Sequence, residues 1–172
     1  MLKKLHQCQW NKPPLLHFQC GIEPADGLVD ELMRRDEDYT YAHTRLYDDT
    51  VPFLGWLRAQ GLLIALVSNC GDTTRGLLEY LGVIPLVDAV VLSCEVGSAK
   101  PSPEIYVTAL ADLGVAAADA VFVDDQPRFC LGAEAVGIRP IQIARDGVDV
   151  AGAGAGWDFP VVTSLLDVKS LL

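Results

Sequence analysis

Residues 119–125 read DAVFVDD, an apolar run of strand-forming side chains that ends in two neighbouring carboxylates, Asp124 and Asp125. A continuous apolar run of this length predicts a buried strand, of the kind found in parallel sheets covered on both faces. Open α/β sheets bind their ligands beyond the carboxyl ends of the strands, which is where the two aspartates fall. Adjacent carboxylates repel each other, and a hard cation such as Mg²⁺ relieves that repulsion and prefers oxygen ligands. An ordinary acidic turn is the alternative, and this stretch alone does not decide between the two.

Strand-like and helix-like segments alternate along the chain from residue 50 to residue 143. This alternation predicts an α/β fold with a doubly wound parallel sheet. Right-handed crossovers then place the carboxyl ends of the strands at one edge of the sheet. Strands are expected at residues 62–67, 89–92, 120–123, 140–143 and 159–163, and helices near Thr50, Asp72, Ser102 and Phe129 and at residues 165–172.

The composition is that of a globular domain. The chain has 172 residues, of which 51% are hydrophobic and 21% charged, enough for one continuous core. Thirteen basic and 23 acidic residues give a formal net charge of −10. This charge argues against nucleic acid or an anionic membrane as a general partner, but it leaves room for a small anionic substrate at a local site. No apolar run reaches the length of a membrane span, and the polar N-terminal residues do not resemble a secretory signal.

The cysteines form neither a metal-binding nor a disulfide pattern. Their number is odd, they are scattered, and no two of them form a CxxC pair, so neither a zinc site nor a disulfide framework is predicted. Free thiols in a reducing cytoplasm are the expected state. The five are Cys8, Cys20, Cys70, Cys94 and Cys130.

The chain divides into three stretches. Residues 1–20 are predicted to be an irregular leader, residues 21–48 to contain one or two helices, and residues 49–172 to form the α/β core. The acidic triplet at residues 36–38 is expected on a solvated helix face rather than at a metal site. Residues 151–156, AGAGAG, are expected to form a flexible surface loop, because no strand leads into the glycines as a dinucleotide-binding turn requires.

Three polar groups far apart in sequence are predicted to converge at the carboxyl edge of the sheet. Ser68 ends the first clear strand, Lys100 lies in the loop after the next strand, and Asp124 and Asp125 end the third. The spacings of 32 and 24 residues each correspond to about one strand–helix unit. A hydroxyl donor, an ammonium group and a carboxylate pair for Mg²⁺ are the parts that phosphoryl transfer needs. Taken singly, Ser68 could cap a turn, Lys100 could be a surface lysine and the aspartates could be solvated. Together, in this order, the groups indicate a phosphate site.

This order of motifs resembles the haloacid dehalogenase superfamily, in its branch of phosphatases with a helical cap. LIALVSN matches the family's second motif at Ser68, and AKPSPEIY matches the third at Lys100. VFVDD matches the fourth motif at Asp124 and Asp125. The resemblance covers roughly residues 46–172, with three motifs in the family's order and spacing.

The resemblance implies a Mg²⁺-dependent phosphomonoester hydrolase that acts on a small phosphorylated metabolite through an aspartyl-phosphate. Ser68 would bind the phosphoryl oxygens with Asn69 beside it, and Lys100 would neutralise the nucleophile and the phosphate. Asp124 and Asp125 would hold Mg²⁺, directly or through water. The acidic fourth motif favours a phosphatase over a dehalogenase, which needs no metal. Residues 21–48 would be a remnant of the cap that selects the substrate, so sugar phosphates, nucleotides and phosphoglycolate-like acids all remain open.

One motif of the family is missing from the sequence before Ser68. The family's first strand ends in DxDx[TV], and its first Asp is the nucleophile. The nearest candidate, LLHFQCGIEP, places Gln19 and Gly21 at the carboxylate positions, and neither can attack phosphorus. That strand lies in the middle of the family's sheet, between the strands that end here at Ser68 and Asp124, so its loss predicts unpaired strand edges. We expect an N-terminally truncated form of a longer phosphatase; a non-catalytic homologue that binds phosphate and metal is the alternative.

Overall fold

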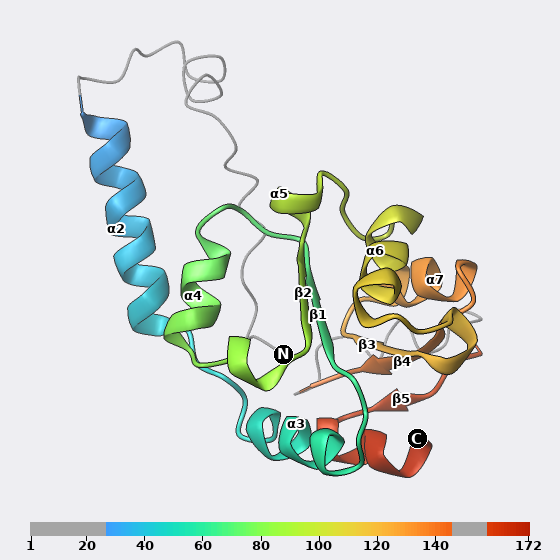
Figure 1. Cartoon of the computed structure of the whole chain (residues 1–172). Coiled ribbons are helices and arrows are strands. Elements are labelled where there is room, and N and C mark those ends of the chain that lie inside the picture. The colour runs from blue at the N-terminus through green and yellow to red at the C-terminus, as the bar shows by residue number, and fades with distance from the viewer. Residues whose placement is uncertain (1–26, 146–157) are drawn as a thin grey trace.

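The structure is a computed structural model and describes residues 27–145 and 158–172. Helices and strands alternate through these residues, as the sequence predicts (Figure 1). The helices are α2 (Leu28–His43), α3 (Thr50–Ala59), α4 (Thr74–Tyr80), α5 (Ser93–Val96), α6 (Pro103–Leu113) and α7 (Pro127–Ala135), with 3₁₀ segments η1 (Ile84–Leu86), η2 (Ala117–Asp119) and η4 (Leu165–Leu171). The strands are β1 (Ala65–Ser68), β2 (Ala89–Leu92), β3 (Val121–Asp124), β4 (Arg139–Ile143) and β5 (Val161–Val162).

The strands are parallel, but they form two sheets instead of the single predicted sheet. β1 pairs with β2, and a second sheet has the order β3-β4-β5. Figure 1 shows the β1–β2 pair standing at an angle to the three-stranded sheet. Among the described residues no strand lies between β1 and β3, so the hydrogen-bonded ladder stops there. That the split reflects a missing central strand stays a prediction.

Helix α6 joins the two sheets into one core. Its buried side chains Ile105, Tyr106 and Ala109 pack in a cluster that includes Val91 of β2. Partly buried residues of β1 and β3 contact the same cluster. The ring of Tyr106 meets Phe122 of β3 edge to face, with the centroids 5.3 Å apart. Burial against a shared helix therefore holds the two sheets together where backbone pairing does not.

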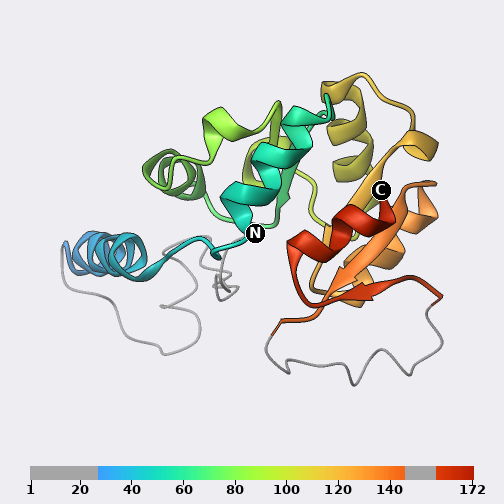
Figure 2. The ribbon, with the colours of Figure 1, turned by 90° about the horizontal axis from the view of Figure 1, so that it is seen from below.

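Two further clusters complete the core on either side. Phe53 of α3 packs against Ile141 and Ile143 of β4 and against η4. Leu78 of α4 packs against Leu92 of β2. In Figure 2, the view from below, α3 and η4 lie next to each other on the side of the sheets that faces the viewer. Helices thus cover the α/β core on both faces, as a doubly wound arrangement requires.

Most predicted elements are found, with shifted ends. The strand predicted at residues 120–123 is one residue later and includes Asp124, while the first predicted strand begins only at Ala65. Helix α4 begins after Thr73 rather than after Asp72, because the loop that follows β1 is longer than predicted. The closing segment is a 3₁₀ helix, in which Ser164 forms a capping box with Asp167. The predicted glycine-rich loop at 151–156 and the leader at 1–20 lie outside the described residues.

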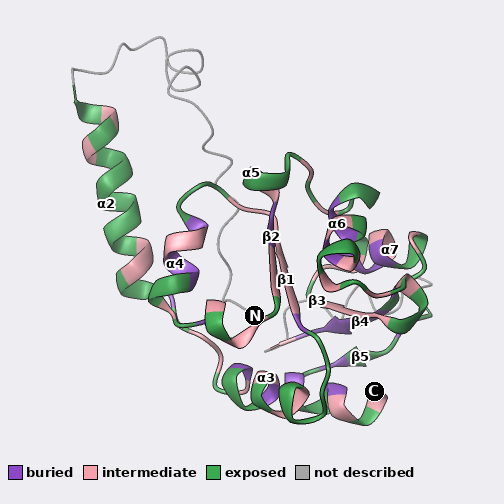
Figure 3. Ribbon diagram, viewed as in Figure 1, coloured by how far each residue is buried: buried purple, intermediate pink, exposed green. Residues whose placement is uncertain are grey.

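Helix α2 is the least buried element of the described chain. None of its side chains is buried, and Figure 3 shows it almost wholly exposed beside the core. The ring of Tyr41, near its end, contacts Tyr80 of α4 with the centroids 5.1 Å apart. The assignment of residues 21–48 to a cap remnant stays a prediction, of which residues 27–48 are described. Within 27–145 and 158–172, no helix combines the length and the apolar character needed to cross a membrane.

Candidate functional site

Lys100 lies between the ends of the two sheets and contacts both. Its Nζ donates a hydrogen bond to the carbonyl of Val67 in β1 at 3.1 Å and to Asp124 Oδ2 at the end of β3 at 2.7 Å. The side chains of Lys100 and Asp124 are only 8% and 4% exposed. A buried ion pair this close gains its stability only when both charges are also hydrogen-bonded. The Val67 carbonyl satisfies this need for the ammonium, so one side chain bridges the gap in the sheet.

Aromatic rings surround the ammonium group of Lys100. Its Nζ lies 4.9 Å from the ring centroid of Phe129 and 5.5 Å from that of Phe122. Aromatic faces attract a cation at such distances, and the attraction strengthens where water is excluded. The lysine is therefore fixed in one place as a positive charge instead of reaching into solvent.

Asn69 fixes the backbone of the lysine loop. Its Nδ2 donates to the carbonyl of Lys100 at 2.8 Å, and its Oδ1 accepts from the Lys100 N–H at 2.7 Å. Both ends of one carboxamide thus bind the main chain of one residue, as in a short strand pair. The sequence predicts Asn69 as a phosphate ligand beside Ser68, its neighbour in the chain. In the structure Asn69 also makes this contact to the backbone of Lys100, which the sequence did not indicate.

Gly132 of α7 allows the lysine loop to pack closely. A Cβ at this position would lie 2.8 Å from the carbonyl oxygen of Pro101, 2.8 Å from the Pro101 side chain and 2.8 Å from the hydroxyl of Tyr106. The Tyr106 hydroxyl is itself fixed, because it donates to the carbonyl of Phe129 at 2.8 Å. Only a glycine fits between these groups, so the loop that carries Lys100 is held from both sides.

The two aspartates at the end of β3 have different surroundings. Asp124 is buried, and its second oxygen accepts from the backbone N–H of Gln126 at 2.9 Å. Asp125 is exposed. Desolvation at the sheet edge and the neighbouring charge of Asp124 raise the pKa of Asp125, and the more distant Lys100 lowers it less. The pair thus carries negative charge that one lysine does not balance.

Buried polar groups lie directly behind these aspartates. Gln142 of β4, paired in register with Asp124, donates to the carbonyl of Asp125 at 3.4 Å. Its Oε1 is buried and finds no hydrogen-bond partner within residues 27–145 and 158–172. The thiol of Cys130 donates to the carbonyls of Asp124 and Ile141, and burial, followed by the charge of Asp124, raises its pKa to about 12. Cys130 is therefore a protonated core residue. The Oε1 of Gln142, in contrast, is a hydrogen-bond acceptor without a donor beside the two carboxylates.

A second buried ion pair lies at the carboxyl edge of the three-stranded sheet. Arg145, two residues after β4, binds Asp49 Oδ1 at 2.8 Å and stacks over the ring of Tyr47 at 4.0 Å. Asp49 Oδ2 accepts from the hydroxyl of Ser164 at 2.9 Å and from the N–H of Leu165 at 2.8 Å. The sequence analysis missed this pair, although the position of Arg145 just beyond a predicted strand was the same signal that identified Ser68 and Asp124.

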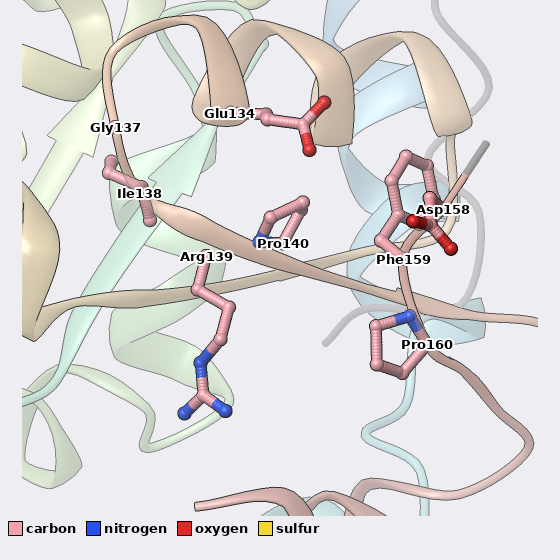
Figure 4. A pocket seen from close by; sticks show the side chains of 8 residues that line it. All are labelled: Glu134, Gly137, Ile138, Arg139, Pro140, Asp158, Phe159 and Pro160. Atoms are coloured by element: carbon pink, nitrogen blue, oxygen red, sulfur yellow. The ribbon is translucent and has the colours of Figure 1, made fainter.

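Two hollows open elsewhere on the surface. One of about 360 Å³ lies among Glu134, Arg139 and residues 158–160, at the amino ends of β4 and β5 (Figure 4). A second of about 290 Å³ lies beside Arg145 and Asp49. The Lys100–Asp124 contact is in neither. The larger hollow is at the edge opposite to the one where parallel sheets bind ligands, so its size does not make it the functional site.

Parallel strands covered by helices, with polar groups beyond the carboxyl ends of β1 and β3, define a protein of the doubly wound α/β class. The family model of haloacid dehalogenase-like hydrolases matches residues 8–137. The chain belongs to the haloacid dehalogenase-like hydrolase family.

Three relatives illustrate the match. A phosphatase of Mycobacterium tuberculosis is 33% identical over 128 residues, which cover 73% of this chain and 58% of that protein. The glyceraldehyde 3-phosphate phosphatase of Methanopyrus kandleri is 32% identical over 133 residues, 76% of this chain and 57% of that protein. The crystal structure of a phosphatase of the family from Thermococcus onnurineus shares the fold, with a TM-score of 0.72, 24% identity, and coverage of 92% of this chain and 69% of that one. The chain thus spans a little over half the length of the curated relatives it matches.

Proposed function

We propose that the chain carries the phosphate site of a Mg²⁺-dependent phosphomonoester hydrolase. The observation that supports this most is the ammonium group of Lys100, held 2.7 Å from Asp124 between the strand ends that carry Ser68 and Asp124. A phosphoryl group spreads its charge over several oxygens, so it needs fixed donors and positive charge at the same point. Membership of a hydrolase family whose named relatives include phosphatases supports the same conclusion.

Each residue has a distinct task in this proposal. The hydroxyl of Ser68 donates a hydrogen bond to a phosphoryl oxygen, and Lys100 neutralises negative charge on the phosphate and on the attacking group. Asn69 lies beside Ser68 at the phosphate and also holds the backbone of Lys100, so that the ammonium group does not have to be ordered when substrate binds. The aromatic rings of Phe122 and Phe129 keep water away from that charge.

Asp124 and Asp125 are the proposed ligands of Mg²⁺. Their donors are hard oxygens of the kind that Mg²⁺ prefers, and Mg²⁺ sites of enzymes commonly combine one or two carboxylates with water and substrate phosphate. The raised pKa of Asp125 and the unpaired Oε1 of Gln142 both fit a site that lacks a positive charge and a hydrogen-bond donor. No group of three possible metal-binding side chains occurs among the residues described, so water and phosphate would complete the coordination. The ion would offset charge on the phosphoryl oxygens.

The proposed reaction needs a nucleophilic aspartate that this sequence does not show. In an aspartyl-phosphate mechanism, that carboxylate forms a bond to phosphorus while the ester oxygen leaves, and water then cleaves the acyl phosphate. We propose that a strand ending in DxDx[TV], encoded upstream of Met1 in a longer form, supplies it between β1 and β3. A non-catalytic homologue that only binds phosphate and metal is the second candidate, because the bridge from Lys100 to Val67 keeps the site in shape without that strand.

The proposed substrate is a small phosphorylated metabolite, and the proposed location is the cytoplasm. The relative from Methanopyrus kandleri is named for a phosphorylated three-carbon sugar, which is the scale of ligand we expect. A net charge of −10 disfavours nucleic acid and anionic membranes as partners.

The test is binding of inorganic phosphate, with and without Mg²⁺, measured by calorimetry on this chain. We expect Mg²⁺-dependent binding that Ser68→Ala weakens about tenfold, since one hydrogen bond to an anion is lost. Asp125→Asn should remove the Mg²⁺ dependence. Asp119→Asn is the matched control, because Asp119 is exposed at the amino end of the same strand, and it should bind like the wild type.

Hydrolysis of an aryl phosphate separates the two candidates. The phosphatase proposal expects little or no turnover by this chain, and turnover once an upstream strand ending in DxDx[TV] is added. Turnover that Asp124→Ala abolishes would rule out the non-catalytic homologue. A stop codon upstream of Met1, with no such strand encoded, would contradict the longer form, and absence of any phosphate binding would contradict both candidates.

A further inference from the structure

Two thiols lie next to each other beside the phosphate-binding residues. Cys70 comes one residue after Asn69, in the loop that follows β1, and Cys94 is in α5, directly after β2. Their Sγ atoms are 3.9 Å apart. Cys94 is exposed and Cys70 is half-buried, so small reagents have access to the pair.

The backbone segments that carry these thiols are already held together. The hydroxyl of Ser93 accepts from the N–H of Cys70 at 2.9 Å and donates to its carbonyl at 3.3 Å. The thiol of Cys94 donates to the carbonyl of Gly71 at 3.2 Å. A disulfide is about 2.05 Å long, so the sulfurs need to approach by about 2 Å, which calls for rotation of both side chains and a small shift of the loop that carries Cys70.

An ion pair adds a third contact between the same two segments. Arg75, at the start of α4, donates to both carboxylate oxygens of Glu95 at 2.6 Å each. Three consecutive residues of α5 thus bind the segment from residue 70 to residue 75. The docking of α5 on this loop therefore does not depend on a bond between the sulfurs.

We propose that Cys70 and Cys94 form a reversible disulfide that weakens phosphate binding at Ser68 and Asn69. Formation of the bond stands independently, whereas its effect on phosphate rests on the proposed function. Reducing compartments contain few structural disulfides, and those that do form there are usually catalytic or redox-sensing. A pair that is docked but reduced in a cytoplasmic protein fits the second kind.

The oxidant we propose is a low-molecular-weight disulfide such as oxidised glutathione. One protein thiolate attacks a glutathione sulfur, which gives a mixed disulfide and releases one glutathione thiolate that takes up the proton. The second protein thiol then attacks the mixed disulfide and releases the other glutathione with its proton. Two protein thiols lose two hydrogens, and one glutathione disulfide becomes two glutathione thiols. Either thiol can make the first attack, because the other lies 3.9 Å away and can resolve the mixed disulfide.

The bond acts on the phosphate site through the loop after β1. At present the Cys70 thiol donates to the carbonyl of Ser68 at 3.7 Å. A disulfide removes that proton and draws Cys70 toward α5. Asn69, which binds both backbone groups of Lys100, is the residue before Cys70 and has to follow. Oxidation therefore disturbs the donors on both sides of the proposed phosphate position.

The disulfide is tested in a Cys8→Ser/Cys20→Ser background, which leaves Cys70, Cys94 and Cys130. The protein is treated with oxidised glutathione, alkylated and digested with trypsin, which separates the three thiols because Arg75 and Arg128 lie between them. Mass spectrometry should show a Cys70–Cys94 peptide pair that dithiothreitol releases. Cys94→Ser should abolish the pair, and Cys130→Ser, the control, should not. Stable glutathione adducts or bonds to Cys130 instead would overturn the site.

Calorimetry with inorganic phosphate and Mg²⁺ tests the effect on binding. We expect about tenfold weaker binding after oxidation, the loss of one hydrogen bond to an anion, and recovery with dithiothreitol. The Cys94→Ser variant should bind equally well with or without the oxidant. A formed disulfide with unchanged phosphate affinity would overturn the regulatory effect. If the reduced protein binds no phosphate, the proposed function and the regulatory effect fail together, while the mass measurement still decides whether the disulfide forms.

Discussion

Two ion pairs among residues 27–145 and 158–172, Lys100–Asp124 and Arg145–Asp49, are largely buried and lie at the carboxyl edge of the strands, yet they differ in how their charge is balanced. Asp49 has one arginine, one hydroxyl and one backbone N–H, and no charged group repels it at short range among its recorded contacts. Asp124 binds Lys100 and stands next to a second carboxylate, Asp125, whose pKa is raised by desolvation and then by the charge of Asp124. The charges of Asp49 and Arg145 balance one for one, although the buried Nε of Arg145 has no hydrogen-bond partner within residues 27–145 and 158–172. Two carboxylates beside one lysine leave a negative charge unbalanced, which is more typical of a site that binds a ligand. Removal of single partners from each pair makes this contrast measurable.

Lys100→Met should have the largest effect. It leaves Asp124 buried without a counter-charge and removes the contact that joins β3 to β1, so we expect a loss of about 3 kcal/mol in the free energy of unfolding and loss of phosphate binding. Urea denaturation and calorimetry measure the two effects. Lys169→Met is the control. Lys169 is on η4, away from the site, and lies over the ring of Trp56 on α3, so its replacement should change neither quantity by much.

Asp49→Asn should reduce stability by somewhat less, about 2 kcal/mol, because the amide keeps a hydrogen bond to Ser164 or Leu165 while Arg145 loses its counter-charge. Phosphate affinity should be unchanged, which would separate this pair from the Lys100 site. Equal losses of phosphate binding in Asp49→Asn and Lys100→Met, measured at a temperature where both are folded, would show that the two pairs belong to one site.

Gly132→Ala should cost about 1–2 kcal/mol of stability, since overpacking in a rigid contact forces backbone shifts. The added methyl group meets the carbonyl of Pro101 at 2.8 Å, so the lysine loop has to move and phosphate binding should fall as well. Denaturation and calorimetry give both numbers. Gly55→Ala is a matched control in α3, because a Cβ there has nothing within 4 Å.

Acid should weaken the Asp49 pair in a predictable direction. Burial raises the pKa of Asp49, but the hydrogen bonds from Arg145, Leu165 and Ser164 outweigh it, and the pKa in the folded state is lowered. A lowered carboxyl pKa contributes stability that is complete above the unfolded value of about 3.9 and is lost as the pH falls further toward the folded value. Between pH 5 and pH 2, roughly the window around these values, the wild type should therefore lose more stability than Asp49→Asn. Parallel curves in urea denaturation would contradict this.

Asp125→Asn should have the smallest effect on stability, within about 0.5 kcal/mol and in the stabilising direction, because an exposed residue loses a repulsive charge. Mg²⁺-dependent binding should nevertheless decrease. Thermal unfolding with and without Mg²⁺ and phosphate measures both. A marked loss of stability would mean that Asp125 has a structural partner that the charge argument omits.

The sequence predicted the polar residues at the carboxyl edge of the strands better than the contacts that hold them in place. The sequence places Ser68 and Asp124 at the ends of apolar runs and Lys100 in the loop between them. The structure joins Lys100 to Asp124 and to the carbonyl of Val67, the residue before Ser68. The missing first motif predicts unpaired strand edges, and the structure has a break between β1 and β3; the link between the two stays a prediction. By contrast, Asp49 and Arg145 are 96 residues apart, and although Arg145 follows a predicted strand, no pattern in the sequence links it to Asp49. The need for glycine at 132 depends on the approach of Pro101, which becomes visible only when α7 and the lysine loop are packed in three dimensions.

The break in the sheet also divides the molecule into two units of backbone hydrogen bonds. The amides of β1 and β2 are protected by one ladder and those of β3, β4 and β5 by another, and within residues 27–145 and 158–172 no backbone-to-backbone hydrogen bond joins the two ladders. Units of this kind open separately, each with its own free energy. Amide hydrogen exchange should therefore sort the strands into two groups with different protection factors, and a strand that fills the gap between β1 and β3 should merge the two groups into one.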